Sequence, residues 1–335
     1  MRYDRKISPG FMRDLKTGRL SPLLARIKED DTLMLAIREK YINIYYRGGN
    51  ILNITEVPTR YPDVRATYEV KFDTNYYLGA SPLPVGFPLL VRDDRDVSRL
   101  IDKIPDLKYT MDRFFSRWNR SEREFQQLVV RENNLSSVAN ETEYFVIDIE
   151  LAGVVESAKF DMIAVRWLSH QRARPEALVP VLIEMKYGNN ALNGDAGLIK
   201  HLVDAYALRE DEELWQDFRT GIQGHISQLE SLDLLRFNRS VAVPELRLHP
   251  TKTPELIFLL ADYNPRARAI LDIMPEFNKI LNERDPQDSE QKEFDVRFFQ
   301  ASFAGYGMHH VSMLTPTDFE RLAQKLYDDS RSRKL

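Results

Sequence analysis

Cysteine is absent from the 335 residues of the chain. Disulfides, thiolate metal sites and a cysteine nucleophile are therefore excluded. Long apolar runs are missing too, since no stretch approaches the roughly 18 consecutive apolar residues of a membrane helix. The opening MRYDRKISPGFMRDLK also lacks the apolar segment of a signal peptide. We therefore expect a soluble, cytoplasmic protein with no membrane partner.

The chain also lacks an excess of positive charge. It carries 47 Lys and Arg against 51 Asp and Glu, which gives a net charge of −4. Such a chain has no overall attraction to nucleic acid, so a nucleic-acid partner would need a local basic patch or metal ions to offset its phosphates. Apolar residues make up 43% of the chain, which is ordinary for a globular protein with a sizeable core.

Several motifs of enzymes are missing. The six histidines show no HExxH spacing, and there is no GxSxG elbow. The glycine-rich segment YGNNALNGDAG does not form a P-loop, because Gly194 and Gly197 are too close and Lys200 is not followed by Ser or Thr. Its other interpretations are a backbone that approaches a phosphate, or a loop that ends in a helix cap at Asp195.

The first hundred residues are predicted to be β-rich. Apolar residues alternate on both sides of Gly48-Gly49, which indicates a hairpin, and ATYEVKFDTNYYL continues in that style. The segment 79–96 is rich in Pro and Gly and reads as a linker or an irregular crossing. We place a domain boundary near residue 105, with a β-rich accessory domain over 1–105 and a second domain over 106–335.

From residue 121 onward helices and strands alternate, with three strands first in a meander. SEREFQQLVVREN is predicted to be a helix with Ser121 as N-cap and Glu124 completing a capping box. EYFVIDIELAG alternates apolar and polar residues and reads as a half-buried strand. The remaining expected strands lie at 158–169, 179–187, 255–264 and 293–303, and the helices at 195–211, 213–235, 265–283 and 315–329, the third with Pro265 near its start. This order predicts an α/β fold in which helices cover a sheet.

Two of these strands carry charged residues where apolar ones are expected. Glu184 and Lys186 share one face of their strand, and Asp161 lies on the strand before it. Buried carboxylates are costly unless they are paired, hydrogen-bonded or bound to a cation. If the two strands are neighbours, the Asp161 and Glu184 carboxylates converge at the end of the sheet with Lys186 beside them. Two hard oxygen ligands suit Mg²⁺ or Mn²⁺, and the ammonium can stabilise charge on a phosphate. The pattern predicts phosphodiester hydrolysis.

At these residues the chain resembles the PD-(D/E)XK nuclease superfamily, which has the restriction-endonuclease-like fold. The resemblance rests on SEREFQ, KFDMIAV, LIEMKYG and the following AGLIKHLVDAY, and it covers roughly residues 115 to 300. It implies a mixed sheet flanked by helices and a metal held by Asp161, Glu184 and the carbonyl of Met185, with Lys186 catalytic. The chain departs from the family pattern at Phe160, where the family has Pro, and in the inserted SHQRARPEALVP between the strands.

The acid on the first helix has three candidates. Glu122 matches the family position and is the choice here, while Glu124 has the capping-box interpretation. Glu132 falls on the helical face of Phe125 and Leu128, so both an inward role and a structural hydrogen bond are open.

Six basic residues are further candidates for contacting the phosphate. Lys200 and His201 follow the third strand on the next helix, where related nucleases place an assisting polar residue. Lys200 and Asp204 are also spaced as an ion pair, and His201 could equally be structural. Arg172 and Arg174, with Lys159 and Arg166, could form a phosphate-binding rim or plain solvated surface.

The Glu-x-Lys triplet alone carries little weight. Glu69 and Lys71 form a second copy after Pro62-Asp63, and Glu290 and Lys292 a third, but neither has the surrounding strands and helix. Two functions follow. The first is a Mg²⁺-dependent nuclease, acting on DNA in defence or repair, or on RNA. The second is a catalytically inactive protein of the same fold that binds nucleic acid or serves in assembly. A homo-oligomer is open in both.

Overall fold

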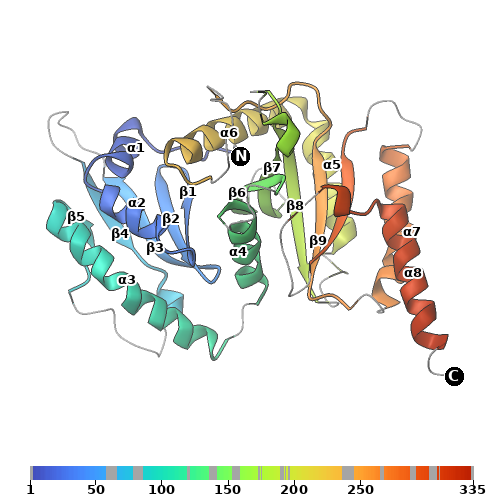
Figure 1. The fold of residues 1–335 in the computed structure, drawn as a ribbon, viewed down its shortest axis with the longest axis horizontal. Coiled ribbons are helices and arrows are strands. Elements are labelled where there is room, and N and C mark those ends of the chain that lie inside the picture. The colour runs from blue at the N-terminus through green and yellow to red at the C-terminus, as the bar shows by residue number, and fades with distance from the viewer. Residues whose placement is uncertain are drawn as a thin grey trace. The chain divides into compact units, whose positions relative to one another are not determined.

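The computed structural model contains two packing units, each with its own five-stranded sheet (Figure 1). The structure describes residues 3–57, 66–77, 86–118, 121–135, 142–152, 159–172, 174, 176–188, 192, 194, 197–235, 245–264, 268–286, 292–301, 308 and 310–332. An N-terminal unit comprises Asp4–Arg131 and Gly224–Leu235. A C-terminal unit comprises Met1–Tyr3, Glu132–Gln223 and Arg236–Leu335. The mixed α/β class expected from the sequence is confirmed.

The N-terminal unit is built on an antiparallel meander in the order β1-β2-β3-β4-β5. Its strands are β1 (Leu33–Ile37), β2 (Tyr41–Tyr46), β3 (Gly49–Val57), β4 (Thr67–Lys71) and β5 (Leu90–Val91). Its helices are α1 (Pro9–Lys16), α2 (Ser21–Lys28), α3 (Asp94–Phe115) and the part of α4 (Ser121–Asn134) up to Arg131. The β-rich prediction therefore missed three helices. The boundary expected at residue 105 falls inside α3, whereas the division by packing lies at residue 131.

The hairpin at Gly48 has a turn one residue earlier than the sequence suggested. Arg47 and Gly48 form the turn with positive φ angles of 50° and 73°, and Gly49 already belongs to β3. This two-residue turn with both φ angles positive matches the right-handed twist of the flanking strands. Gln127 of α4 fixes it, because its Oε1 accepts from Gly48 N at 2.6 Å and its Nε2 donates to Thr32 O at 2.8 Å.

Residues from the other half of the sequence complete the N-terminal unit. Gln228 of α6 (Glu212–Ser231) accepts from Ile7 N at 3.1 Å and donates to the Arg5 carbonyl at 2.8 Å. Lys28 forms an ion pair with Asp233 at 2.5 Å. The chain therefore passes through the C-terminal unit and returns before the N-terminal unit is closed.

The C-terminal unit contains a mixed sheet in the order β10-β9-β8-β7-β6. Its strands are β6 (Tyr144–Ala152), β7 (Lys159–Arg166), β8 (Val179–Tyr187), β9 (Glu255–Ala261) and β10 (Asp295–Ala301). β6, β7 and β8 are antiparallel in sequence order, and β8, β9 and β10 are parallel. The meander and the order of helices and strands predicted from residue 121 onward are confirmed.

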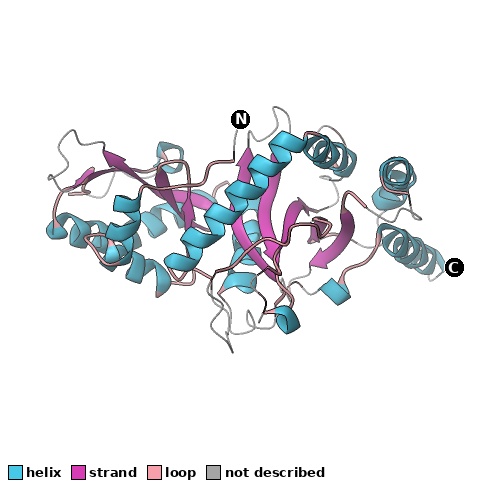
Figure 2. Cartoon of the chain, turned by 90° about the horizontal axis from the view of Figure 1, so that it is seen from above, coloured by secondary structure: helices cyan, strands magenta, loops and turns pink. Residues whose placement is uncertain are grey.

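Helices α5 (Leu198–Glu210), α7 (Arg268–Arg284) and α8 (Pro316–Ser332) lie beside this sheet (Figure 1), and Figure 2 shows helices and strands of the same region from above. Aromatic rings join helices to strands. The Phe298 ring of β10 stacks on Phe319 of α8 with centroids 4.4 Å apart, and Phe258 of β9 meets Phe277 of α7 at 5.3 Å. Pro265 and Asp195, expected near helix starts, lie outside the described residues.

From Tyr144 to Ile149, the part of β6 whose burial the structure describes, the strand is buried on both faces, so the half-buried prediction is wrong there. Tyr144, Val146 and Asp148, expected on the solvent side, are all buried. Asn134 at the end of α4 explains part of this burial, since its side chain accepts from Val146 N at 2.9 Å and donates to Val146 O at 2.6 Å. Among the described residues, no helix combines the length and apolarity that crossing a bilayer requires.

The hairpin geometry generates the first prediction. A Cβ at Gly48 would lie 2.2 Å from the Arg123 carbonyl oxygen, in addition to the positive φ. We expect Gly48→Ala to lower the free energy of unfolding by about 1–3 kcal/mol, measured by urea denaturation. Gly224→Ala is the control, because a Cβ there meets nothing within 4 Å and the helix gains propensity. Equal stability of the two variants would contradict the prediction.

Candidate functional site

The β7–β8 pairing ends before either strand does. Met162↔Ile183 is the last pair of this ladder. β7 nevertheless continues to pair with β6 as far as Lys159, and β8 continues with β9 as far as Tyr187. The two strands therefore separate at this end of the sheet. Asp161 lies at the separation, and its Oδ2 accepts a hydrogen bond from Met185 N at 2.8 Å, in place of a backbone carbonyl.

Glu184 and Lys186 lie on β8 just beyond the last pair and are almost fully buried, at 2% and 4% exposure. Glu184 Oε1 accepts from Lys186 Nζ and lies 2.9 Å from His201 Nε2 of α5. A carboxylate in the interior is tolerated when it is paired in this way. The predicted pairing of the strand that carries Asp161 with the strand that carries Glu184 and Lys186 is therefore confirmed.

The second oxygen of Glu184 is the unusual atom of this site. Oε2 is buried and has no hydrogen-bond partner among the described residues. A buried carboxylate oxygen without a donor is costly, and a bound cation or water would relieve that cost. The N–H and C=O of one strand residue point to the same side, so the Met185 carbonyl faces the side of Asp161.

The Asp161 and Glu184 carboxylates and the Met185 carbonyl are ligand types that suit a hard divalent cation. Two carboxylates and one carbonyl supply oxygen only, which is what Mg²⁺ and Mn²⁺ prefer. His201 adds a nitrogen nearby, and its Nδ1 is buried without a hydrogen-bond partner among the described residues. Asp161, Glu184 and Met185 are therefore the residues that could hold such an ion.

The two candidate residues on α5 have different surroundings. His201 contacts Glu184 directly, so it belongs to this site. The Lys200 ammonium is paired with the buried Asp204 carboxylate one turn along the helix, as in the ion-pair interpretation of the spacing. Its positive charge is thereby largely neutralised.

Arg172 and Arg174 lie beyond the end of β7 opposite Asp161, so they do not join a phosphate rim beside Glu184, whereas Lys159 begins β7 at the Asp161 end. The two arginines follow the end of β7 where Arg166 pairs with Val179, five residues before Glu184 on β8. Five strand residues span roughly 17 Å. Arg172 is buried against the Phe145 and Trp167 rings and donates to the Thr142 carbonyl at 2.5 Å. Burial lowers its pKa.

The three helix-α4 acids are separated by the division between units. Glu122 is exposed in the first turn of α4 and belongs to the N-terminal unit, whereas Asp161, Glu184 and Lys186 belong to the C-terminal unit. Both carboxylate oxygens of Glu124 accept from Arg47, at 2.8 and 3.1 Å, a contact that the capping-box interpretation does not include. Glu132 is half-buried and belongs to the C-terminal unit.

A second cluster of possible ligands, missed from the sequence, lies at the start of β9 and β10. Ligand atoms of Glu255, Asp295 and His310 lie within 4.8 Å of one another. Glu255 is fully buried, and burial raises its pKa to about 7 although Arg166 lies 2.5 Å away. Arg297 pairs with Asp295 at 2.8 Å. Two guanidinium groups thus already supply positive charge. The sequence did contain a signal for this cluster, because Glu255 and Asp295 are each the first residue of an apolar strand.

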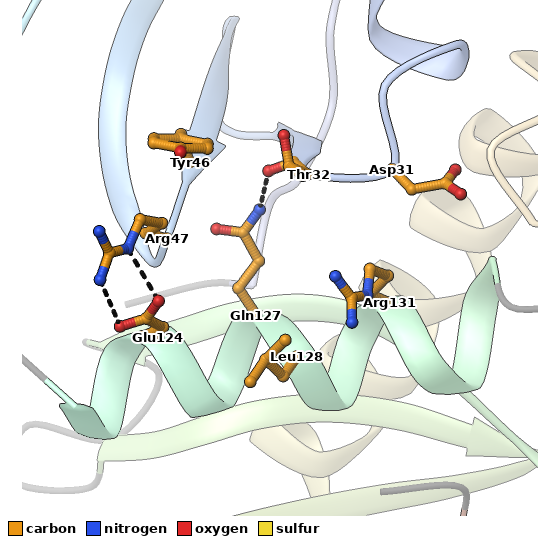
Figure 3. Close-up of a pocket in the computed structure, with 8 residues that line it drawn as sticks. All are labelled: Asp31, Thr32, Tyr46, Arg47, Glu124, Gln127, Leu128 and Arg131. Atoms are coloured by element: carbon orange, nitrogen blue, oxygen red, sulfur yellow. Dashed lines mark hydrogen bonds and ion pairs between the residues drawn. The ribbon is translucent and has the colours of Figure 1, made fainter. Parts of the chain in front are cut away.

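The N-terminal unit has a pocket of about 320 Å³ between α4 and the sheet (Figure 3). Its lining residues are Asp31, Thr32, Tyr46, Arg47, Glu124, Gln127, Leu128 and Arg131. Arg47 is held by Glu124 and by Asp112 at 2.9 Å, which explains how a non-glycine residue is kept at positive φ. Gln127 holds the hairpin turn through Gly48 N. Arg47, Glu124 and Gln127 therefore stabilise the structure of the N-terminal unit.

The buried Glu184–Lys186 pair generates a prediction about stability. Removing one charge leaves the other uncompensated in the interior, so we expect Glu184→Gln and Lys186→Met each to cost about 3–5 kcal/mol of unfolding free energy. The double variant should cost less than the sum, because neither charge remains. Urea denaturation of all four proteins measures the coupling.

The second Glu-x-Lys pair is the matched control. Glu69 and Lys71 on β4 are 3.0 Å apart but largely exposed. The same double-mutant cycle there should give less than about 1 kcal/mol of coupling. Additive costs at Glu184 and Lys186 would contradict the expected coupling.

Comparison of the chain with protein-family models gave no match, and comparison with curated proteins and with solved structures gave none either.

Proposed function

We propose that the C-terminal unit is a metal-dependent nuclease of restriction-endonuclease-like fold that hydrolyses phosphodiester bonds of DNA. The observation that carries the proposal is the position of Asp161, bonded to Met185 N between the buried Glu184 and Lys186, where the pairing of β7 with β8 ends. The order of elements from α4 to β10 also supports it, since a helix, three antiparallel strands, helices and a parallel strand follow one another.

The chemistry of the three side chains suits attack of water on phosphorus. In this proposal a divalent cation held by Asp161, Glu184 and the Met185 carbonyl would neutralise the phosphate and acidify a bound water. Met185 N–H fixes the Asp161 carboxylate. Lys186 donates hydrogen bonds to a non-bridging phosphate oxygen and stabilises the charge that develops there. Water oxygen bonds to phosphorus as the bond to the departing sugar oxygen breaks.

His201 is a positioning residue in this proposal. Its imidazole contacts the same Glu184 oxygen as Lys186 does. It therefore holds the carboxylate so that Oε2 faces the ligand. A nearby group that fixes the orientation of a metal-binding carboxylate commonly tunes affinity.

Cleavage by variants tests the proposal. With Mg²⁺ or Mn²⁺ the purified protein should cut plasmid or single-stranded DNA. Lys186→Ala and Asp161→Asn should each lower the rate about 100-fold or more, because each removes a group acting on the reacting phosphate. Offering RNA in parallel distinguishes the two substrates.

Lys71→Ala is the control for this assay, because it alters the other strand-borne Glu-x-Lys copy in an exposed pair. Circular dichroism must show that each variant is folded. Asp161 is half-buried, so Asp161→Asn should remain folded even if Lys186→Ala does not. Folded Asp161→Asn with full activity would overturn the nuclease assignment, and no cleavage by the wild-type protein would favour the inactive, nucleic-acid-binding alternative.

Metal binding can be tested without activity. At a Mn²⁺ concentration 100 times the dissociation constant, the folded protein should gain about 2.7 kcal/mol, seen as a rise in melting temperature. Glu184→Gln and Asp161→Asn should abolish the rise, because they remove the ligands. Asp295→Asn should retain it. Loss of the rise in Asp295→Asn alone would place the ion at the Glu255 cluster and contradict the prediction.

A further inference from the structure

The Lys252 ammonium and the backbone of Arg174 both contact Gln171, at the end of the C-terminal sheet opposite Glu184. Gln171 Oε1 accepts from Lys252 Nζ at 3.1 Å, and its backbone carbonyl accepts from Arg174 N at 2.9 Å. Lys252 precedes β9, and Gln171 and Arg174 follow β7. One residue thus anchors both the side chain of Lys252 and the backbone of Arg174.

Neither cation has a carboxylate partner within 4.0 Å among the described residues. The nearby carboxylates are committed elsewhere. Glu255 pairs with Arg166 at 2.5 Å. Arg247 lies 2.7 Å from Glu245 and 3.9 Å from Glu176. Lys252 and Arg174 therefore carry uncompensated positive charge.

The surroundings of Lys252 point to the same excess of positive charge. Partial burial, then Arg166 and Arg174, lower the pKa of Lys252. His249 accepts from the backbone N–H groups of Thr251 and Lys252, at 3.2 and 3.1 Å, and so shapes the turn that presents Lys252. Burial and Lys252 lower the pKa of His249 as well. An anion at this place would relieve these repulsions.

We propose that Lys252 and Arg174 bind phosphate oxygens of a nucleic-acid backbone at a point remote from the cleavage site. The choice of nucleic acid as the anion rests on the proposed function. Arg174 is exposed and Lys252 half-exposed, so both can reach a polyanion. The sheet sets the separation, because Val179 and Glu184 are roughly 17 Å apart along β8. That distance corresponds to about five base pairs of duplex at 3.4 Å per phosphate. Lys252 and Arg174 would therefore contact the nucleic acid about five base pairs away from the bond that is cleaved.

The salt dependence of binding tests this inference. Each phosphate neutralised on duplex DNA adds about 0.9 to the slope of log K against log salt. In EDTA, where cleavage cannot proceed, the double variant Arg174→Gln/Lys252→Gln should bind a 20-base-pair duplex with a slope smaller in magnitude by about 1.8. Fluorescence anisotropy of a labelled duplex measures this.

Arg247→Gln is the matched control, because Arg247 is an exposed arginine of the same region with its charge already paired. It should leave the slope unchanged. An unchanged slope in the folded double variant overturns the inference, and so does an equal loss in Arg247→Gln, which would reflect net charge alone. Loss of saturable inorganic phosphate binding in the double variant, with duplex binding intact, would also overturn it in favour of a small anion.

The outcome is distinguishable from that of the proposed function. A protein that binds duplex DNA with the predicted change of slope but never cleaves it supports this surface and refutes the nuclease. A protein that cleaves DNA but shows no change of slope supports the nuclease and refutes this surface.

Discussion

The separation of β7 from β8 beyond Met162 and Ile183 governs the chemistry of the C-terminal unit. A continuous ladder would satisfy Met185 N–H with a carbonyl. Where the strands separate, the Asp161 carboxylate accepts the hydrogen bond from Met185 N–H and lies at the edge of β8. Glu184 and Lys186 lie on β8, which still pairs with β9 there, and both side chains are buried, with His201 of α5 against Glu184. Charge is thus held inside a sheet where only mutual pairing makes it stable.

The order of elements from α4 onward was predictable because its strands and helices have clear periodicity. β8 and β9 are long apolar runs, and α7 and α8 repeat apolar residues at helical spacing. α1 and α2 were missed because each has only eight residues, which gives little more than two turns in which to see a helical period. α3 was missed because it starts in an acidic stretch and contains Pro105, which disfavours a helix interior.

The candidate site was predictable where the argument used only side-chain alternation and neighbouring strands. Asp161, Glu184 and Lys186 follow from these two rules. Arg172 and Arg174 were expected at the wrong end of the strand pair. In an antiparallel pair the connection lies at the end where the first strand finishes, and Asp161 lies near where β7 begins. The packing of Arg172 against Phe145 and Trp167 could not be inferred, because it depends on contacts across the unit.

The return of residues 224–235 to the N-terminal unit has a consequence for synthesis on the ribosome. Gln228 satisfies the backbone of Arg5 and Ile7, which are translated more than 200 residues earlier. The N-terminal unit therefore remains incompletely packed until β6, β7 and β8 have been synthesised. Closing so long a loop is costly in entropy and slows the last step. Nascent chains halted before residue 224 should accordingly depend on chaperones more than the finished protein does.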